Sequence, residues 1–411
     1  MHTWHRNVTA VGVSQFFSIA GFSFAIPFAP FFIQDQLGVH DPVRLRLWVT
    51  AFSAVVPLAM SVFAPIWGAA ADRYGRRMML LRANIAACLI LTLMGLVRNV
   101  ESLVLLRFVQ GIFTGTMSAA QAMVAAAAPR DRTGMALGTL SAAVFSGSLA
   151  GVALGGVCAE FLGYRASFFI SGGLLLLAAL WVLVGTEEPA DAEAGADDPA
   201  LAPTARAPGW RALGAAWPIL GLILGINFVR TFDGAWLSLL VQDIHGGLKG
   251  AALWTGLLAA TGSVAGLLAG PLLGNLADRI PPPRIGKVSA LISGLLMIPQ
   301  ALARHLPLLF VTRFGAVFCA GGLDPVFQIW LSKVTPPQRR GAVFGWASSA
   351  RSLGWLAAAL LSGAVAAGVS LRATFLFSGA LYLLLIPAIS AVVRYLQRHA
   401  TGSPESEVRR Q

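Results

Sequence analysis

The chain has 411 residues, of which 56% are hydrophobic and only 12% are charged. A soluble globular domain carries about 25% charged residues, so this composition excludes an ordinary soluble protein and indicates a chain that crosses a membrane several times. The formal net charge of +12 would suit a nucleic-acid partner. The basic residues recur in short clusters between apolar runs, however, and we therefore expect no nucleic-acid binding.

Twelve apolar runs are long enough to cross a bilayer core of about 30 Å, which needs about 20 residues of helix. They extend over approximately 8–33, 46–70, 78–98, 102–128, 135–160, 166–185, 214–242, 251–276, 286–304, 306–334, 341–367 and 371–396. The first run has no small-residue cleavage site after it, so we interpret it as a membrane span rather than a signal peptide.

Residues 186–213 interrupt this series with acidic residues, Pro and Ala but no long apolar run. Such a composition cannot bury a core and predicts a flexible linker. It divides the chain into an N-terminal bundle, 1–185, and a C-terminal bundle, 214–411, which ends in a short tail.

The two halves repeat each other at a nearly constant spacing. The dipeptide DR at position 72 recurs at 278, and RF at 107 recurs at 313, both after 206 residues. The sequence RASFF at 165 recurs as RATFL at 372, after 207 residues. We therefore predict an all-α membrane protein with 12 transmembrane helices in two pseudo-symmetric six-helix bundles.

The distribution of basic residues predicts the orientation. Of the 30 Lys and Arg residues, 19 fall on the side that holds both termini and the linker, 7 fall on the opposite side, and 4 lie within spans. Positive residues are enriched on the cytoplasmic side, so both termini are expected there.

Four motifs give the sequence a resemblance to a known family. Residues 68–80 read GAAADRYGRRMML, residues 107–111 RFVQG, residues 27–30 PFAP, and residues 147–156 GSLAGVALGG. The chain resembles the major facilitator superfamily, and within it the twelve-span drug:proton antiporters, whose loop pattern G-x-L-A-D-R-x-G-R-R/K-x-x-L departs here only at Ala70. Val152 stands where the antiporter pattern G-x-x-x-G-P-x-x-G-G has Pro, which weakens the inference of antiport from that motif.

The resemblance implies that the loop after the second span and its weaker copy near residue 274 gate the cytoplasmic side, through the start of the eleventh span. The gating residues would be Gly68, Asp72, Arg73, Gly75, Arg76, Arg77, Asp278 and Arg279. An alternative is that these Arg residues only set the topology. Small residues at spacing four permit close helix packing, and we expect Gly147, Gly151, Gly155 and Gly156 to share one packing face.

Charged side chains inside the membrane are costly and mark functional sites. Six candidates lie deep within spans: Arg107, Arg230, Asp233, Arg313, Asp324 and Arg351. Depth along the helices, at about 1.5 Å per residue, predicts two groups: Asp324 with Arg351 near the midplane, and Arg230, Asp233 and Arg313 nearer the outside.

The first span has no acid, so a proton-coupled transporter would have to use Asp233 or Asp324; static structural ion pairs are the alternative. The resemblance gives Arg107 a part in proton coupling, and the alternative is a structural Arg that bonds carbonyl groups. Aromatic, Met and amide side chains could line a site for a bulky apolar ligand: Phe22, Phe24, Gln110, Met117, Gln121, Asn227, Trp236 and Gln328.

These features favour a proton-coupled exporter of drugs or other small amphiphilic molecules that works by alternating access. The alternatives are a proton-coupled importer of a sugar or organic anion, and a non-transporting membrane sensor on the same fold. No P-loop sequence, nucleophile–base constellation or metal-ligand spacing is present, so we expect neither an enzyme nor a cofactor or metal. The expected partners are a small-molecule substrate, protons and the lipid bilayer, and the expected state is a monomer in the bacterial inner membrane.

Overall fold

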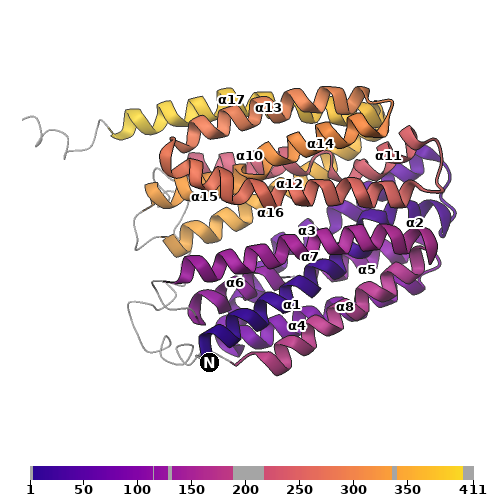
Figure 1. Ribbon diagram of the computed structural model, residues 1–411, viewed down its shortest axis with the longest axis horizontal. Coiled ribbons are helices and arrows are strands. Elements are labelled where there is room, and N and C mark those ends of the chain that lie inside the picture. Colours follow the sequence, from indigo (N-terminus) through magenta and orange to yellow (C-terminus); the bar gives the residue numbers. More distant parts are fainter. Residues whose placement is uncertain (1–2, 114, 128–131, 188–216, 336–339, 401–411) are drawn as a thin grey trace, which may run out of the picture. The chain divides into compact units, whose positions relative to one another are not determined.

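The computed structural model describes residues 3–113, 115–127, 132–187, 217–335 and 340–400. Every regular element within these ranges is an α-helix or a 3₁₀-helix (Figure 1). Eleven stretches of the described chain are long and apolar enough to cross a membrane.

The first span is a helix broken near its end by prolines. It consists of α1 (Thr3–Ala25), the 3₁₀-helix η1 (Ile26–Phe28) and α2 (Ala29–Asp35). Pro27 and Pro30 cannot donate backbone hydrogen bonds, which explains the break. The following helices are α3 (Pro42–Tyr74), α4 (Arg76–Leu96), α5 (Val100–Phe113), α6 (Thr116–Ala127), α7 (Thr133–Phe161) and α8 (Tyr164–Gly185).

The seventh span is also broken by a 3₁₀-helix, but without a proline at the break. It consists of α10 (Trp217–Thr231), the 3₁₀-helix η3 (Gly234–Trp236) and α11 (Leu237–His245). The remaining helices are α12 (Ala251–Arg279), α13 (Pro282–Leu302), α14 (Leu306–Gly321), α15 (Leu323–Val334), α16 (Arg340–Gly368) and α17 (Leu371–Ala400).

The predicted fourth span, 102–128, is two helices rather than one. It corresponds to α5, of 14 residues, and α6, of 12 residues. Gly115, which separates them, has a φ of +131° that a helix cannot contain. Each piece alone is too short to span a bilayer, and because residue 114 between them lies outside the described residues, this run is not among the eleven stretches of the described chain.

Helix starts repeat along the chain as the sequence motifs do. The helices α4, α5, α7 and α8 begin at 76, 100, 133 and 164, and α13, α14, α16 and α17 begin at 282, 306, 340 and 371. Each start therefore recurs after 206 or 207 residues. The predicted duplication of a six-helix unit is confirmed at the level of secondary structure.

The chain folds into two compact units. The first comprises residues 1–203 with 235–267, and the second comprises residues 204–234 with 268–411. In the first, α1 packs along α7 and α8, and α8 also packs along α4 (Figure 1). In the second, α13 packs along α17 and α14, and α10 along α16. The assignment of α11 and most of α12 to the first unit differs from the division at 185 and 214, which stays a prediction.

Candidate functional site

A buried ion pair forms where the seventh span is broken. Arg230 lies in the last turn of α10, and Asp233 follows the end of that helix. Arg313, on α14, donates a hydrogen bond from Nη1 to Oδ2 of Asp233 and forms an ion pair with it. The Asp233 side chain is only 1% exposed and that of Arg313 is 13% exposed. The pair is therefore almost fully removed from solvent.

A cavity of about 140 Å³ opens beside this pair. Arg230, Asp233 and Arg313 line it together with Tyr382, and its remaining lining residues are Met297, Ala316, Val317, Ala320 and Gly321. Two guanidinium groups face one carboxylate, so the cavity has one excess positive charge when Asp233 is ionised. Of the two charge groups that depth along the helices predicts, the structure thus brings together the outer one, Arg230, Asp233 and Arg313.

The other predicted charge group cannot be compared in the same way. Asp324 lies in α15, but its side chain is outside the described residues. Arg351, on α16, is half-buried. The proposed pairing of these two side chains stays a prediction.

Arg107 lies apart from both groups, in the first unit. Its Nη1 donates to Oε1 of Gln110 at 2.5 Å, and its guanidinium carbon lies 4.7 Å from the ring centroid of Phe52 on α3. Its Nε is buried and has no hydrogen-bond partner among the described residues. Arg107 is therefore held by an amide and an aromatic face, and no acid pairs with it in the described chain.

The predicted substrate-site residues differ in how far they are buried. Phe24, Gln110, Asn227 and Trp236 are buried, Phe22, Met117 and Gln328 are half-buried, and Gln121 is exposed. None of these eight lines the cavity beside Asp233. Tyr382 and Met297 do line it, and the sequence analysis missed both because neither carries a charge and each has the apolar neighbours of an ordinary packing residue.

The loop between α3 and α4 is as short as a loop can be. α3 ends at Tyr74 and α4 begins at Arg76, and Gly75 between them has a φ of +83° and a ψ of 155°. That conformation is essentially restricted to glycine, so the turn predicted at Gly75 is confirmed. The side chains of Asp72, Arg73 and Asp278 and the burial of Gly68 lie outside what the structure describes, and Arg279 is exposed. The gating role stays a prediction.

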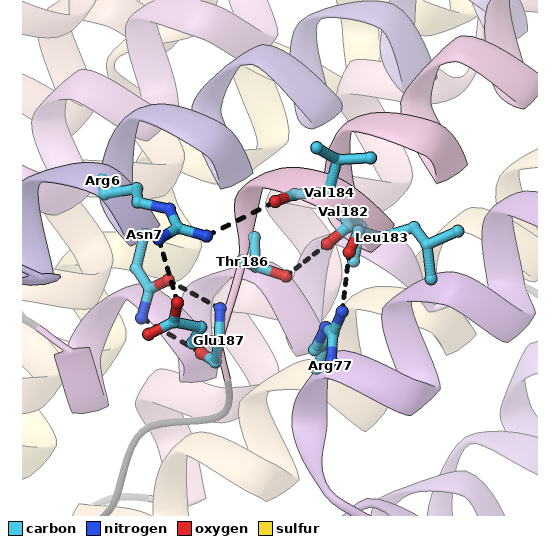
Figure 2. A network of polar contacts seen from close by, with 8 residues as sticks. All are labelled: Arg6, Asn7, Arg77, Val182, Leu183, Val184, Thr186 and Glu187. Atoms are coloured by element: carbon cyan, nitrogen blue, oxygen red, sulfur yellow. Dashed lines mark hydrogen bonds and ion pairs between the residues drawn. The ribbon is translucent and has the colours of Figure 1, made fainter.

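Arg77 makes a contact that the motif does not predict. Its Nη2 donates to the carbonyl oxygen of Leu183 at 2.7 Å, at the end of α8 (Figure 2). Arg6 forms an ion pair with Glu187 at 2.9 Å, and Asn7 exchanges two hydrogen bonds with the backbone of Glu187, at 2.9 and 3.1 Å. These groups satisfy carbonyls that the end of a helix leaves without partners. They tie α1 and α4 to the point where α8 ends.

The glycines of α7 lie on two faces rather than one. A Cβ added at Gly147, Gly151 or Gly155 would collide with a carbonyl oxygen of α1. A Cβ at Gly156 would instead lie 2.9 Å from Ala252 O and from Gly256 Cα of α12. The predicted single face is wrong for Gly156, because adjacent residues on a helix point about 100° apart.

A duplicated six-helix unit, with a buried charge cluster beside a helix break, is typical of secondary transporters. A family model described as the Major Facilitator Superfamily matches residues 11–303 and 231–411, and the chain belongs to that superfamily. The multidrug resistance protein MdtG of Citrobacter koseri is 32% identical over 378 residues, 90% of this chain and 91% of that protein. MdtG of Serratia proteamaculans is 32% identical over 407 residues, 98% of this chain and 96% of that protein.

Solved structures share the fold. The POT family transporter PepTSo has a TM-score of 0.77 at 13% identity, over 96% of this chain and 98% of its own. The nucleoside transporter NupG has a TM-score of 0.74 at 12% identity, over 95% and 99%. The superfamily match and the MdtG relatives, together with the apolar helices, make the protein a multi-pass membrane transporter of small molecules.

Proposed function

We propose that the protein exports drugs or other small amphiphilic molecules from a bacterial cell in exchange for protons. It would lie in the inner membrane with both termini in the cytoplasm and work by alternating access. The relatives named as multidrug resistance proteins support the substrate class. The buried ion pair between Asp233 and Arg313, next to the cavity, is the observation that supports coupling of protons to transport.

Proton exchange at Asp233 would change which contacts α10 and α14 can make. In the ionised state the carboxylate holds Arg313. When Asp233 takes up a proton, Arg313 loses its counter-ion inside the membrane and must find another acceptor or move toward water. The two protonation states therefore favour different arrangements of these segments, which is the requirement for coupling a proton to a conformational change.

Reconstitution into proteoliposomes tests the proposal. A proton gradient is imposed, and the movement of a cationic dye is measured against that of sugars and organic acids. Dye export that consumes the proton gradient is expected. Sugar or organic-acid uptake together with protons would instead identify an importer, and the absence of any flux would favour a sensor.

Matched variants then test the coupling residue. Asp233→Asn is expected to abolish pH-dependent dye transport, and Asp324→Asn tests the second candidate acid. Glu101→Gln is the control, because Glu101 is exposed in the first turn of α5. Full pH-dependent transport in both aspartate variants would contradict coupling through these residues.

A further inference from the structure

Arg82 emerges from the lipid-facing side of α4. Met78, Ile85 and Leu89 are all exposed, and they lie four, three and seven residues from Arg82, so the four share one helix face. In a helix that spans a membrane, an exposed apolar face is in contact with lipid. The sequence places a permanently charged side chain in the middle of that face.

A fixed aromatic platform holds the guanidinium group. Cζ of Arg82 lies 3.3 Å from the ring centroid of Trp67 on α3, which is cation–π geometry. Nε1 of Trp67 donates to the carbonyl oxygen of Ile112 at 2.6 Å, and its ring centroid lies 5.9 Å from that of Phe113. The indole ring is thus anchored to α5 and defines where the positive charge sits.

The charge of Arg82 has no counter-ion among the described residues. Its Nε and Nη1 are buried and lack hydrogen-bond partners, and no acid forms an ion pair with it among the described residues. A charged group within a membrane span is costly without a partner. Arg107 in the same unit differs, since it donates to Gln110.

Arg82 lies a short distance inside the start of α4. Its Cα is six residues inside the start of α4, or about 9 Å, and helix side chains point back toward the N-terminal end. An Arg side chain is long enough to return its charged end toward the interface. The Nη2 end of the guanidinium group can therefore extend toward phosphates of the adjoining leaflet, while Nε and Nη1 stay buried.

We propose that Arg82, stacked on Trp67, binds the phosphate of an anionic phospholipid in the leaflet next to the start of α4. Basic sites between transmembrane helices on the cytoplasmic side bind anionic headgroups. The exposed side chains of Ile85 and Leu89 continue from Arg82 toward the bilayer centre and, with Met78 on the interface side, offer acyl chains an apolar surface. A soluble phosphate would leave that surface unused, which favours a lipid. The proposal does not depend on the substrate or on proton coupling.

Native mass spectrometry of the purified protein with a mixture of phosphatidylglycerol and phosphatidylcholine tests this site. The wild type is expected to retain phosphatidylglycerol preferentially. Arg82→Gln should lower that preference about fivefold, the effect expected for one basic residue at a membrane surface. Arg82→Lys, which keeps the charge, should retain most of it. Arg98→Gln is the matched control, because Arg98 is exposed just beyond the opposite end of α4.

Several results would overturn the proposal. A wild type without preference for phosphatidylglycerol, an unchanged preference in Arg82→Gln, or an equal loss in Arg98→Gln would each exclude the site. Displacement of the bound lipid by millimolar inorganic phosphate would assign the site to a soluble anion. If Arg82→Gln does not fold, Trp67→Leu takes its place, since it removes the platform and keeps the charge; an unchanged preference in that variant would also exclude the site.

Discussion

At the scale of single residues, the charge cluster of the C-terminal half depends on mutual neutralisation. Asp233 and Arg313 are 80 residues apart in sequence, and each alone would be an uncompensated charge inside the membrane. Together they cancel, and Arg230 beside them keeps the cavity positive. The pair is therefore a structural element as well as a candidate coupling site, and the two roles must be separated by experiment.

A double-mutant comparison separates them. Asp233→Asn leaves Arg313 buried without its counter-ion and should lower stability by about 3 kcal/mol, because breaking one side of a buried pair strands the other charge. Asp233→Asn combined with Arg313→Gln removes both charges and should regain most of that loss. Thermal unfolding in detergent measures both variants.

The transport of the double variant then identifies the role. If the pair couples protons to transport, the stable double variant remains without pH-dependent flux. Recovery of full pH-dependent flux together with stability would show that the pair has only a structural role.

At the scale of helices, α7 uses its glycines to contact two different neighbours closely. Three of them lie against carbonyl oxygens of α1: Gly147 against that of Phe16, Gly151 against that of Ala20, and Gly155 against that of Phe24. Small residues at this spacing let helix backbones approach closely in membranes, where burial of apolar surface gives no driving force. The packing of α1 on α7 therefore depends on the absence of side chains at three positions.

Two alanine substitutions in α7 should have opposite effects. Gly151→Ala places a methyl group against the backbone of Ala20 and should destabilise the protein by about 1–3 kcal/mol, the usual cost of overpacking. At Gly138 a Cβ would meet no atom within 4 Å, so Gly138→Ala should be neutral or slightly stabilising because alanine favours helix. Thermal unfolding of the two variants checks this, and equal stabilities would contradict the close contact.

Breaks within helices are a feature that the pattern of apolar residues does not predict. An apolar run reports that a segment is buried in lipid or protein, but it does not report whether the backbone stays helical. The run 102–128 is as apolar as its neighbours, yet its helix is interrupted next to Gly115. The prolines at 27 and 30 do mark the break in the first span, because their missing N–H groups are visible in the sequence.

At the scale of the whole molecule, duplication made most of the fold predictable. The sequence motifs recur after 206 or 207 residues, and the helix starts recur at the same spacing, so the helices of one half predict those of the other. The site was predictable only where charge marked it: Arg230, Asp233 and Arg313 could be grouped by depth. Tyr382 could not, since a tyrosine in an apolar run is also an ordinary packing residue, and the stacking of Arg82 on Trp67 requires a contact between two helices that no spacing encodes.

Orientation in the membrane is the remaining whole-molecule prediction, and it follows from the excess of 19 basic residues over 7 on the side of the termini. Single cysteines test it in a background that lacks Cys88, Cys158 and Cys319. Exposed residues in short loops are suitable positions: His40 before α3, His305 before α14, and Ile280 after α12. A membrane-impermeant maleimide that is applied to intact cells reaches the periplasm but not the cytoplasm. It should therefore label His40→Cys and His305→Cys. Ile280→Cys should react only after permeabilisation, because it follows the Asp278-Arg279 copy of the basic loop. Labelling of this variant in intact cells would show that the topology is the reverse of the predicted one. The start of α4, with Arg82, would then lie in the opposite leaflet.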